Sequence, residues 1–221
     1  MTVQRFIFAI DHVSTWVGKA VSWLMLVLTI VVCVEVIKRY MFGMPTAWIF
    51  DAENMLYGTL FMMAGAYTLA QNAHVRGDFL YSSMRPRTQA TLDLILYIVF
   101  FFPGIAALIY AGYDYASYSW HIQEHSNVTA DGPPVYHFKT VIPIAGALVM
   151  LQGIAEVTRC VQCLRTGKWP ERLKDVAETD VIEQQLEHSE YVDEESRKIA
   201  IERASQIDEE ARQRGMGDKL T

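Results

Sequence analysis

The chain has few cysteines and no excess of basic residues, and these two shortages exclude several classes of protein. It contains three cysteines in 221 residues, Cys33, Cys160 and Cys163, which are too few for the disulfide framework of a small secreted domain. Lys and Arg number 19 against 25 Asp and Glu, so the basic footprint of a nucleic-acid-binding protein is absent. We therefore expect no nucleic-acid partner.

Net charge is also nearly missing from the first 170 residues. Residues 1–170 carry 11 Lys and Arg against 10 Asp and Glu, whereas residues 171–221 carry 8 against 15. The mean hydropathy of +0.14 is thus an average over two regions with different surroundings. We predict a membrane domain at 1–168 and an acidic tail at 169–221.

Long uncharged apolar runs exclude a wholly soluble chain. A transmembrane helix needs about 20 mostly apolar residues to cross roughly 30 Å of hydrocarbon. Four runs meet or approach that length, at about 17–40, 48–71, 91–117 and 139–163. The second is the least certain, because Asp51 and Glu53 lie in its first turns. The sequence predicts an all-α integral membrane protein with four transmembrane helices.

Lys and Arg are distributed unequally among the loops, and this distribution predicts the orientation. Cytoplasmic loops retain Lys and Arg. Arg76, Arg85 and Arg87 follow the second apolar run, whereas residues 117–137 contain neither Lys nor Arg. We therefore expect both termini to be cytoplasmic.

The tail has interleaved acids and bases among residues that favour helices. Ala200, Ala204, Ile207 and Ala211 would share one face of such a helix. Because this stripe is thin, we predict a solvated, partly helical cytoplasmic extension. A helix that binds a partner is the alternative.

A short histidine motif raises the question of a metal site. His121, Glu124 and His125 match H-x-x-E-H, the inverted zinc-protease pattern. The motif lies in a short external loop, and no third acidic ligand on a second helix is evident. We expect neither a metal site nor a catalytic residue here.

Cys160 and Cys163 form a C-x-x-C motif and define an alternative function. Four-helix membrane proteins that exchange thiols and disulfides need their cysteines on the oxidising side of the membrane. These two cysteines lie at the predicted cytoplasmic end of the fourth run. This location counts against a thiol–disulfide redox protein, which we keep as the second of three functional hypotheses.

Charged groups near the end of the first run are informative, because ionisable groups in lipid are costly and usually face protein or water. Glu35 and Arg39 lie four residues apart on one helix face. Arg39 is also placed to pair with Glu53 across the hairpin. We predict an interfacial ion pair that holds two helices together. A stand-alone transporter with Glu35 as its coupling acid is a third hypothesis.

An ordered set of motifs runs through the apolar region. It comprises KRYMFGMPTAW at 38–48, Glu53, Gly65-Ala66, HVRGD at 74–78, Gly132-Pro133-Pro134, Tyr136, Pro143 and Leu151-Gln152-Gly153. This combination resembles the small membrane subunit of tripartite ATP-independent periplasmic (TRAP) transporters. The likeness covers roughly residues 15–165 and has the same number of helices.

The resemblance implies a small scaffold subunit that is not an enzyme. The transporter it implies is sodium-coupled, lies in the bacterial inner membrane and imports a small organic solute, commonly an organic acid. The implied partners are a large elevator-type permease subunit, a periplasmic substrate-binding protein and the lipid bilayer. Sodium and substrate would bind to the large subunit, so we expect no cofactor, metal or substrate-binding residue in this chain.

The candidate site residues are accordingly structural or interface residues. Three belong to the outer hairpin and three to the inner loop. Two more would extend to the lipid headgroups and so fix how deeply the protein sits in the bilayer. They are Arg39, Trp48 and Glu53, then His74, Arg76 and Asp78, and finally Arg85 and Arg87.

Overall fold

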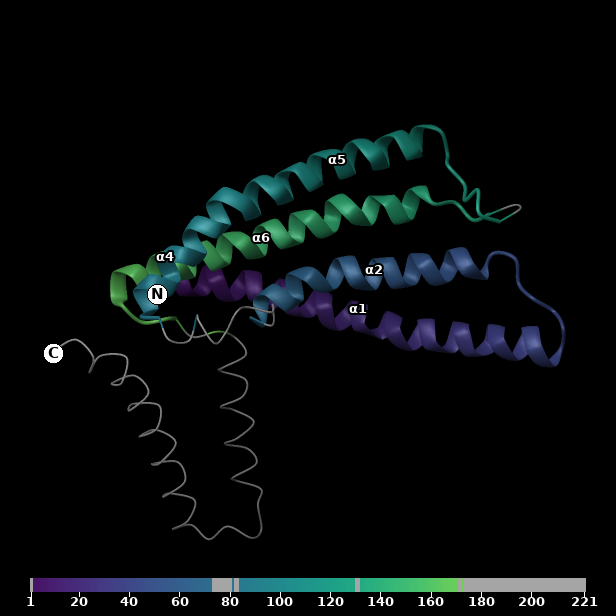
Figure 1. Cartoon of the computed structure of the whole chain (residues 1–221), viewed down its shortest axis with the longest axis horizontal. Coiled ribbons are helices and arrows are strands. Elements are labelled where there is room, and N and C mark those ends of the chain that lie inside the picture. The colour runs from purple at the N-terminus through teal and green to yellow at the C-terminus, as the bar shows by residue number, and fades with distance from the viewer. Residues whose placement is uncertain (1, 73–80, 82–83, 130–131, 171, 173–221) are drawn as a thin grey trace, which may run out of the picture. The chain divides into compact units, whose positions relative to one another are not determined.

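The computed structural model describes residues 2–72, 81, 84–129, 132–170 and 172, which are helical apart from their connections (Figure 1). In chain order the elements are α1 (Thr2–Met41), α2 (Ile49–Ala70), α4 (Pro86–Leu96), the π-helix η1 (Tyr97–Phe101), α5 (Phe102–His121) and α6 (Tyr136–Thr166). Within these ranges β-structure is limited to one isolated bridge, between His125 and Pro134. The predicted all-α class is confirmed for the described part of the chain.

Three helical stretches are long and apolar enough to cross a membrane. They are Val3–Met41, Pro86–His121 and Tyr136–Thr166. The 22 residues of α2 would extend about 33 Å, which also matches the hydrocarbon thickness. However, α2 is not among the three, and it carries Asp51 and Glu53 near its start. The count of four spans therefore stays a prediction.

The chain divides into two compact units. The first comprises Met1–His74 and Ile95–Val157, and the second comprises Val75–Leu94 and Thr158–Thr221. The predicted domain boundary at residue 168 stays a prediction, because residues 173–221 lie outside the described part.

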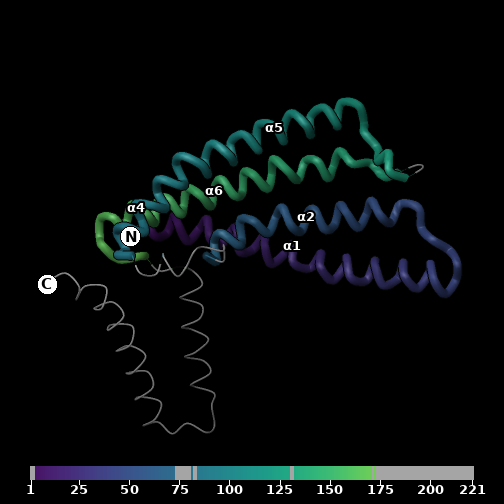
Figure 2. Tube along the Cα trace, viewed as in Figure 1, coloured from purple at the N-terminus to yellow at the C-terminus, as the bar shows by residue number. Residues whose placement is uncertain are grey.

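Two helical hairpins, α1–α2 and α5–α6, build the first unit (Figure 2). Within each hairpin the helices approach closely where one of them has a glycine. A Cβ atom on Gly18 would lie 2.5 Å from the Cβ of Tyr67 in α2, and one on Gly112 would lie 2.7 Å from Ile142 in α6. Such small residues are typical of contacts between membrane helices.

The two hairpins also pack against each other through α2 and α6. A Cβ atom on Gly58 would lie 2.5 Å from the ring of Phe138. Because α2 thus contacts both α1 and α6, part of its surface is covered by neighbouring helices. Its composition can therefore be less apolar than that of a helix surrounded by lipid.

A buried polar crossing joins α1 to α6 at the other end of the same unit, near the N-terminus. Ser14 Oγ donates a hydrogen bond to Gln152 Oε1 at 2.8 Å, and Gln152 Nε2 donates to Asp11 Oδ1 at 2.8 Å. All three side chains are at most 2% exposed. Next to them, Ile7, Ile10 and Ala155 form an apolar cluster.

The outward-facing side chains of the first unit are mostly large and apolar. Trp23, Ile30, Phe61 and Phe100 are each more than 60% exposed. A soluble helical bundle would bury such residues in its core. This surface therefore fits a hydrocarbon environment or a hydrophobic partner, as expected for a membrane protein.

A π-helical turn precedes Pro103 in the helix that runs from α4 to α5. Proline lacks the N–H that would otherwise bond to the carbonyl four residues earlier, and its ring crowds that carbonyl. The wider turn at Tyr97–Phe101 accommodates this defect without ending the helix.

Contacts in the second unit hold the chain that follows α6 against α4. Trp169 Nε1 donates a hydrogen bond to Gln89 Oε1 at 3.0 Å. Nearby, the Sγ of Cys163 donates to the carbonyl oxygen of Pro86 at 3.5 Å. The end of α6 and its exit are thus fixed on one face of α4.

Candidate functional site

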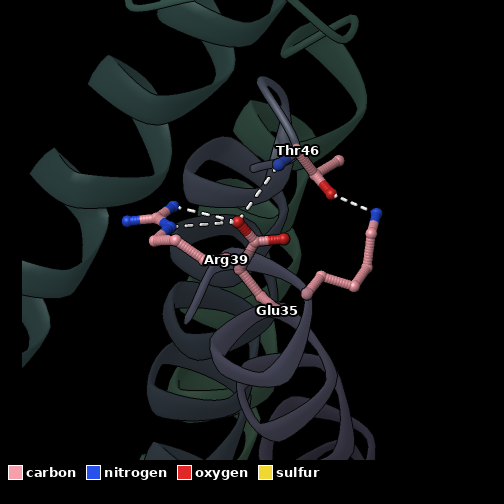
Figure 3. Close-up of polar contacts among 4 residues, drawn as sticks. Glu35, Arg39 and Thr46 are labelled. Carbon is pink, nitrogen blue, oxygen red and sulfur yellow. Dashed lines mark hydrogen bonds and ion pairs between the residues drawn. The ribbon is translucent and has the colours of Figure 1, made fainter. Parts of the chain in front are cut away.

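The first polar cluster surrounds Glu35 at the end of α1, and this carboxylate is 5% exposed. Its Oε1 accepts a hydrogen bond from Arg39 Nη2 at 3.0 Å and one from the backbone N–H of Thr46 at 3.1 Å (Figure 3). The Nζ of Lys38 donates to Thr46 Oγ1 at 2.7 Å. Glu35 therefore fastens the α1–α2 connection to the last turns of α1.

The backbone at the end of α1 prepares this arrangement. Gly43 adopts a φ of +64°, the left-handed conformation with which helices commonly end and which glycine adopts most easily. The N–H groups of Phe42 and Met44 both donate to the carbonyl of Lys38. The chain thus reverses sharply and brings Thr46 back over Glu35.

Arg39 pairs with Glu35 and not with Glu53, which corrects the pairing expected across the hairpin. Residues four apart on a helix already face each other, so their pairing requires no approach of a second helix. Glu53 is half-buried, and within the described ranges it has no ion pair. Trp48 lies at the N-cap of α2 and is 53% exposed.

The second cluster surrounds Asp51 in the first turn of α2. Its Oδ1 accepts a hydrogen bond from Ser126 Oγ at 2.6 Å, and its Oδ2 accepts one from Thr129 Oγ1 at 2.7 Å. Both hydroxyl groups belong to the α5–α6 connection. The carboxylate is 7% exposed and is favoured at a helix N-terminus by the helix dipole. Asp51 thus joins the two hairpins.

The third cluster stabilises the α5–α6 connection itself. Lys139 Nζ forms an ion pair with Glu124 and lies 3.9 Å from the centroid of the Tyr115 ring. The hydrogen bond from Lys139 holds the pKa of Glu124 below its ordinary value. Glu124 is therefore ionised at neutral pH.

Backbone and aromatic contacts complete this connection. Ser126 N donates to the carbonyl of Pro133 at 2.9 Å. The indole N–H of Trp120 donates to Thr140 Oγ1 at 2.8 Å, and the centroid of its ring lies 4.4 Å from that of Tyr136. We call residues 42–48 and 122–135, with the helix ends that flank them, the loop end of the first unit.

Two shallow cavities lie along α5 and α6 and share Tyr113 and Pro143 in their linings. Their volumes are about 410 and 450 Å³. Neither lining includes Asp, Glu, Lys or Arg. They therefore lack the converging charged groups that would hold an organic acid.

The histidine motif does not form the geometry of a zinc protease. α5 ends at His121, and Gln123 has a φ of +49°, so His121 and His125 do not share a helix face. Glu124 is bound to Lys139, and His125 Nδ1 lies 2.9 Å from the carbonyl oxygen of Gln123. Among the residues that the structure describes, no three His, Cys, Asp or Glu side chains are grouped to hold a metal.

The cysteine motif is buried and reduced. Cys160 and Cys163 are at most 1% exposed and form no disulfide. Buried thiols in apolar surroundings are unreactive, because a redox partner needs access to a thiolate. This arrangement does not favour the thiol–disulfide hypothesis.

The remaining candidate residues lie between the end of α2 and the first turn of α4. His74, Arg76 and Asp78 lie outside the described residues. Arg85 and Arg87 are described and exposed, as a snorkelling role requires. That role stays a prediction.

The described residues thus combine long apolar helices, closely packed hairpins and charged groups that bind one another. Residues 28–163 match the family model of the DctQ component of tripartite ATP-independent periplasmic transporters. The chain belongs to this family. As a DctQ component it is a small permease component of a TRAP transporter and thus a membrane transport protein. A comparison with curated proteins finds no significant match.

Two contacts of this DctQ protein lie outside what the sequence predicted. The sequence places Asp51 in the second apolar run, but it does not predict that Asp51 binds the α5–α6 connection. The polar crossing of Asp11, Ser14 and Gln152 is also new. A weak signal exists for it, since Asp11 and Ser14 are three residues apart and share the helix face of the buried Ile7.

Proposed function

We propose that this chain is the scaffold subunit of a sodium-coupled TRAP importer, which packs on the large elevator-type permease subunit and stabilises it. The large subunit binds sodium and the solute, a small organic acid delivered by a periplasmic binding protein. The chain lies in the bacterial inner membrane with both termini in the cytoplasm. It has no enzymatic activity and needs no cofactor of its own.

The hydrogen bonds that two buried carboxylates accept are the observation that supports this proposal. Glu35 and Asp51 each accept hydrogen bonds from this chain, and those bonds fasten one helix or connection to another. Transport sites instead present freed backbone groups of broken helices, or carboxylates that face a water-filled path. The polar groups at the loop end therefore support a static scaffold. They do not support the third hypothesis, a stand-alone transporter with Glu35 as its coupling acid.

The fourth span of this scaffold is α2. It is about 33 Å long, and it contacts α1 at Gly18 and α6 at Phe138. Two neighbouring helices shield it from lipid, which offsets its lower hydropathy. Asp51 at its start lies at the loop end, beside the α5–α6 connection. An even number of spans places the N-terminus and the tail on the same side of the membrane.

Purification with the large subunit tests this function. Membranes that contain both subunits are solubilised, and a tag on this chain is used for the pull-down. The large subunit should be recovered with it, and should lose stability when this chain is omitted. A large subunit that is equally stable and active without this chain contradicts the scaffold function.

A further inference from the structure

Asp114 in α5 is an acidic residue that faces outward at the depth of the membrane. It lies three residues before the predicted end of its span at 117, and it is exposed. Within the described ranges its carboxylate has neither a hydrogen bond nor an ion pair. Glu35 and Asp51, by contrast, are buried and accept hydrogen bonds from this chain. Asp114 therefore does not serve the internal packing of the unit.

Lipid is a poor environment for the Asp114 carboxylate. The rings of Trp120 and Tyr136 lie together at the loop end, as aromatic residues do where the hydrocarbon ends. Asp114 lies six residues before Trp120, which is about 9 Å along the helix. The side chains of a helix lean toward its N-terminus, which in α5 is the direction away from the loop end. Because ionisable groups at such depth usually face protein or water, we expect a covering partner.

Small residues open the same face of α5 to another helix. Ala107 and Ala111 precede Asp114 by seven and three residues, which places all three on one face, and both are exposed. A Cβ atom on Gly104 would meet nothing within 4 Å among the described residues. Small residues four apart let a second membrane helix approach closely. The opposite face of α5, with Gly112, is buried inside the unit.

Two exposed tyrosines complete this face. Tyr110 and Tyr118 are each more than 60% exposed. Tyr110 lies about 15 Å before Trp120, near the middle of hydrocarbon that is roughly 30 Å thick. A tyrosine hydroxyl removed from water usually has a hydrogen-bond partner, and lipid chains offer none. Tyr110 also lines the cavity of about 450 Å³, which would receive a partner's side chain. We call Ala107, Tyr110, Ala111, Asp114 and Tyr118 the α5 face.

We propose that the α5 face docks on a membrane-spanning helix of the large permease subunit that carries a Lys or Arg opposite Asp114. Charge complementarity selects this occupant, because a carboxylate removed from water needs an opposite charge beside it. Ala107 and Ala111 set the distance of approach, and polar groups of the partner bind the hydroxyl of Tyr110. This docking rests on the proposed function, because it names the surface through which the scaffold holds the large subunit.

Photo-crosslinking in the full-length chain, assembled with the large subunit, tests the location of this surface. Benzoylphenylalanine replaces Tyr110, and a matched control carries it at Ile30 of α1, which is also more than 60% exposed. Each position lies eleven residues before the end of its helix, and α2 and α6 separate α1 from α5 there (Figure 1).

The probe at position 110 should crosslink to the large subunit at least several-fold more than the probe at position 30. Equal yields from the two positions contradict the docking. Crosslinks from position 110 to lipid alone, or to a second copy of this chain, overturn it.

Charge variants of Asp114 test the pairing. D114K places a cation against the partner's cation, so the recovery of the large subunit should fall by about tenfold or more. D114N should lower it by roughly three- to tenfold, and D114E should retain it. N54K is the control, because Asn54 is exposed and lies at a similar distance from the loop end in α2. A recovery from D114K equal to that from N54K overturns the pairing.

The same samples separate this docking from the scaffold function. A wild-type chain that does not retain the large subunit overturns the scaffold function, and the docking with it. A wild-type chain that retains and stabilises the large subunit, but neither crosslinks to it from position 110 nor responds to D114K, overturns the docking alone. The scaffold function then stands on another surface of the unit.

Discussion

The loop end and the buried polar crossing both join helices through polar side chains, but they differ in how far these side chains are exposed to solvent. At the loop end the pairs are partly solvated, and the side chain of Arg39 is 50% exposed. At the crossing, Asp11, Ser14 and Gln152 are almost fully buried. Exposed ion pairs contribute little, about 0–1 kcal/mol, whereas a buried polar group that loses its partner costs about 1–3 kcal/mol. The crossing should therefore be the more sensitive of the two regions.

Replacement of Gln152 should have the largest effect. Gln152→Ala removes one donor and one acceptor, so Asp11 and Ser14 lose their bonds to it and a cavity remains. We expect a loss of about 3 kcal/mol in the free energy of unfolding. The measurement is denaturant unfolding in bicelles, with Gln162→Ala on the same helix as the control. Equal stabilities of the two variants would show that the crossing is unimportant.

Replacement of Asp51 should have the next largest effect. Asp51→Ala removes the acceptor of Ser126 and Thr129 and thus separates the two hairpins at the loop end. We expect a loss of about 1–2 kcal/mol and faster proteolysis of the α5–α6 connection. Asn54→Ala, in the same turn of α2, is the control. If the connection is cleaved no faster than in that control, Asp51 does not hold the α5–α6 connection against α2.

A decrease in pH should weaken the loop end through Glu124. Its pKa in the folded protein is below the ordinary value of 4.5, so ionised Glu124 stabilises the fold above about pH 4.5. This contribution is lost as the pH falls through the folded-state pKa. The stability difference between the wild type and Glu124→Gln should therefore be constant at neutral pH and shrink in acid. A difference that grows in acid would contradict this sign.

The exposed Arg85 and Arg87, at the start of α4, should affect assembly more than stability. Arg85→Ala/Arg87→Ala removes two groups that we expect to reach the lipid headgroups. The double variant should unfold like the wild type but retain less of the large subunit and support slower uptake. Unchanged uptake and unchanged recovery would remove these residues from the candidate site.

The helices were predictable because the membrane restricts the possible structures. Backbone groups in hydrocarbon must be satisfied within a segment, so the apolar runs at 17–40, 91–117 and 139–163 must be helical. The run containing α2 was harder to judge, because shielding by α1 and α6 allows a composition that resembles a soluble helix. α1 begins at Thr2, well before the span predicted at 17–40, and the crossing to Gln152 holds this first part.

The candidate site was predictable only where its contacts are local. Glu35 and Arg39 are four residues apart, and helix geometry alone brings them together. Asp51 and Ser126, by contrast, are brought together by the packing of two hairpins, as are Asp11 and Gln152. No spacing rule encodes such contacts. In the H-x-x-E-H motif a local pattern was misleading. α5 ends at His121 and Gln123 adopts a left-handed conformation, so the motif does not form the helix that zinc binding requires.

The central claim is that this chain supports transport without carrying it out. Sodium-driven uptake in liposomes tests it most directly, with the binding protein supplied outside and three preparations compared: this chain alone, the large subunit alone, and both. The scaffold function predicts no uptake by this chain alone and full uptake when both subunits are present. Uptake of solute by this chain alone would contradict it.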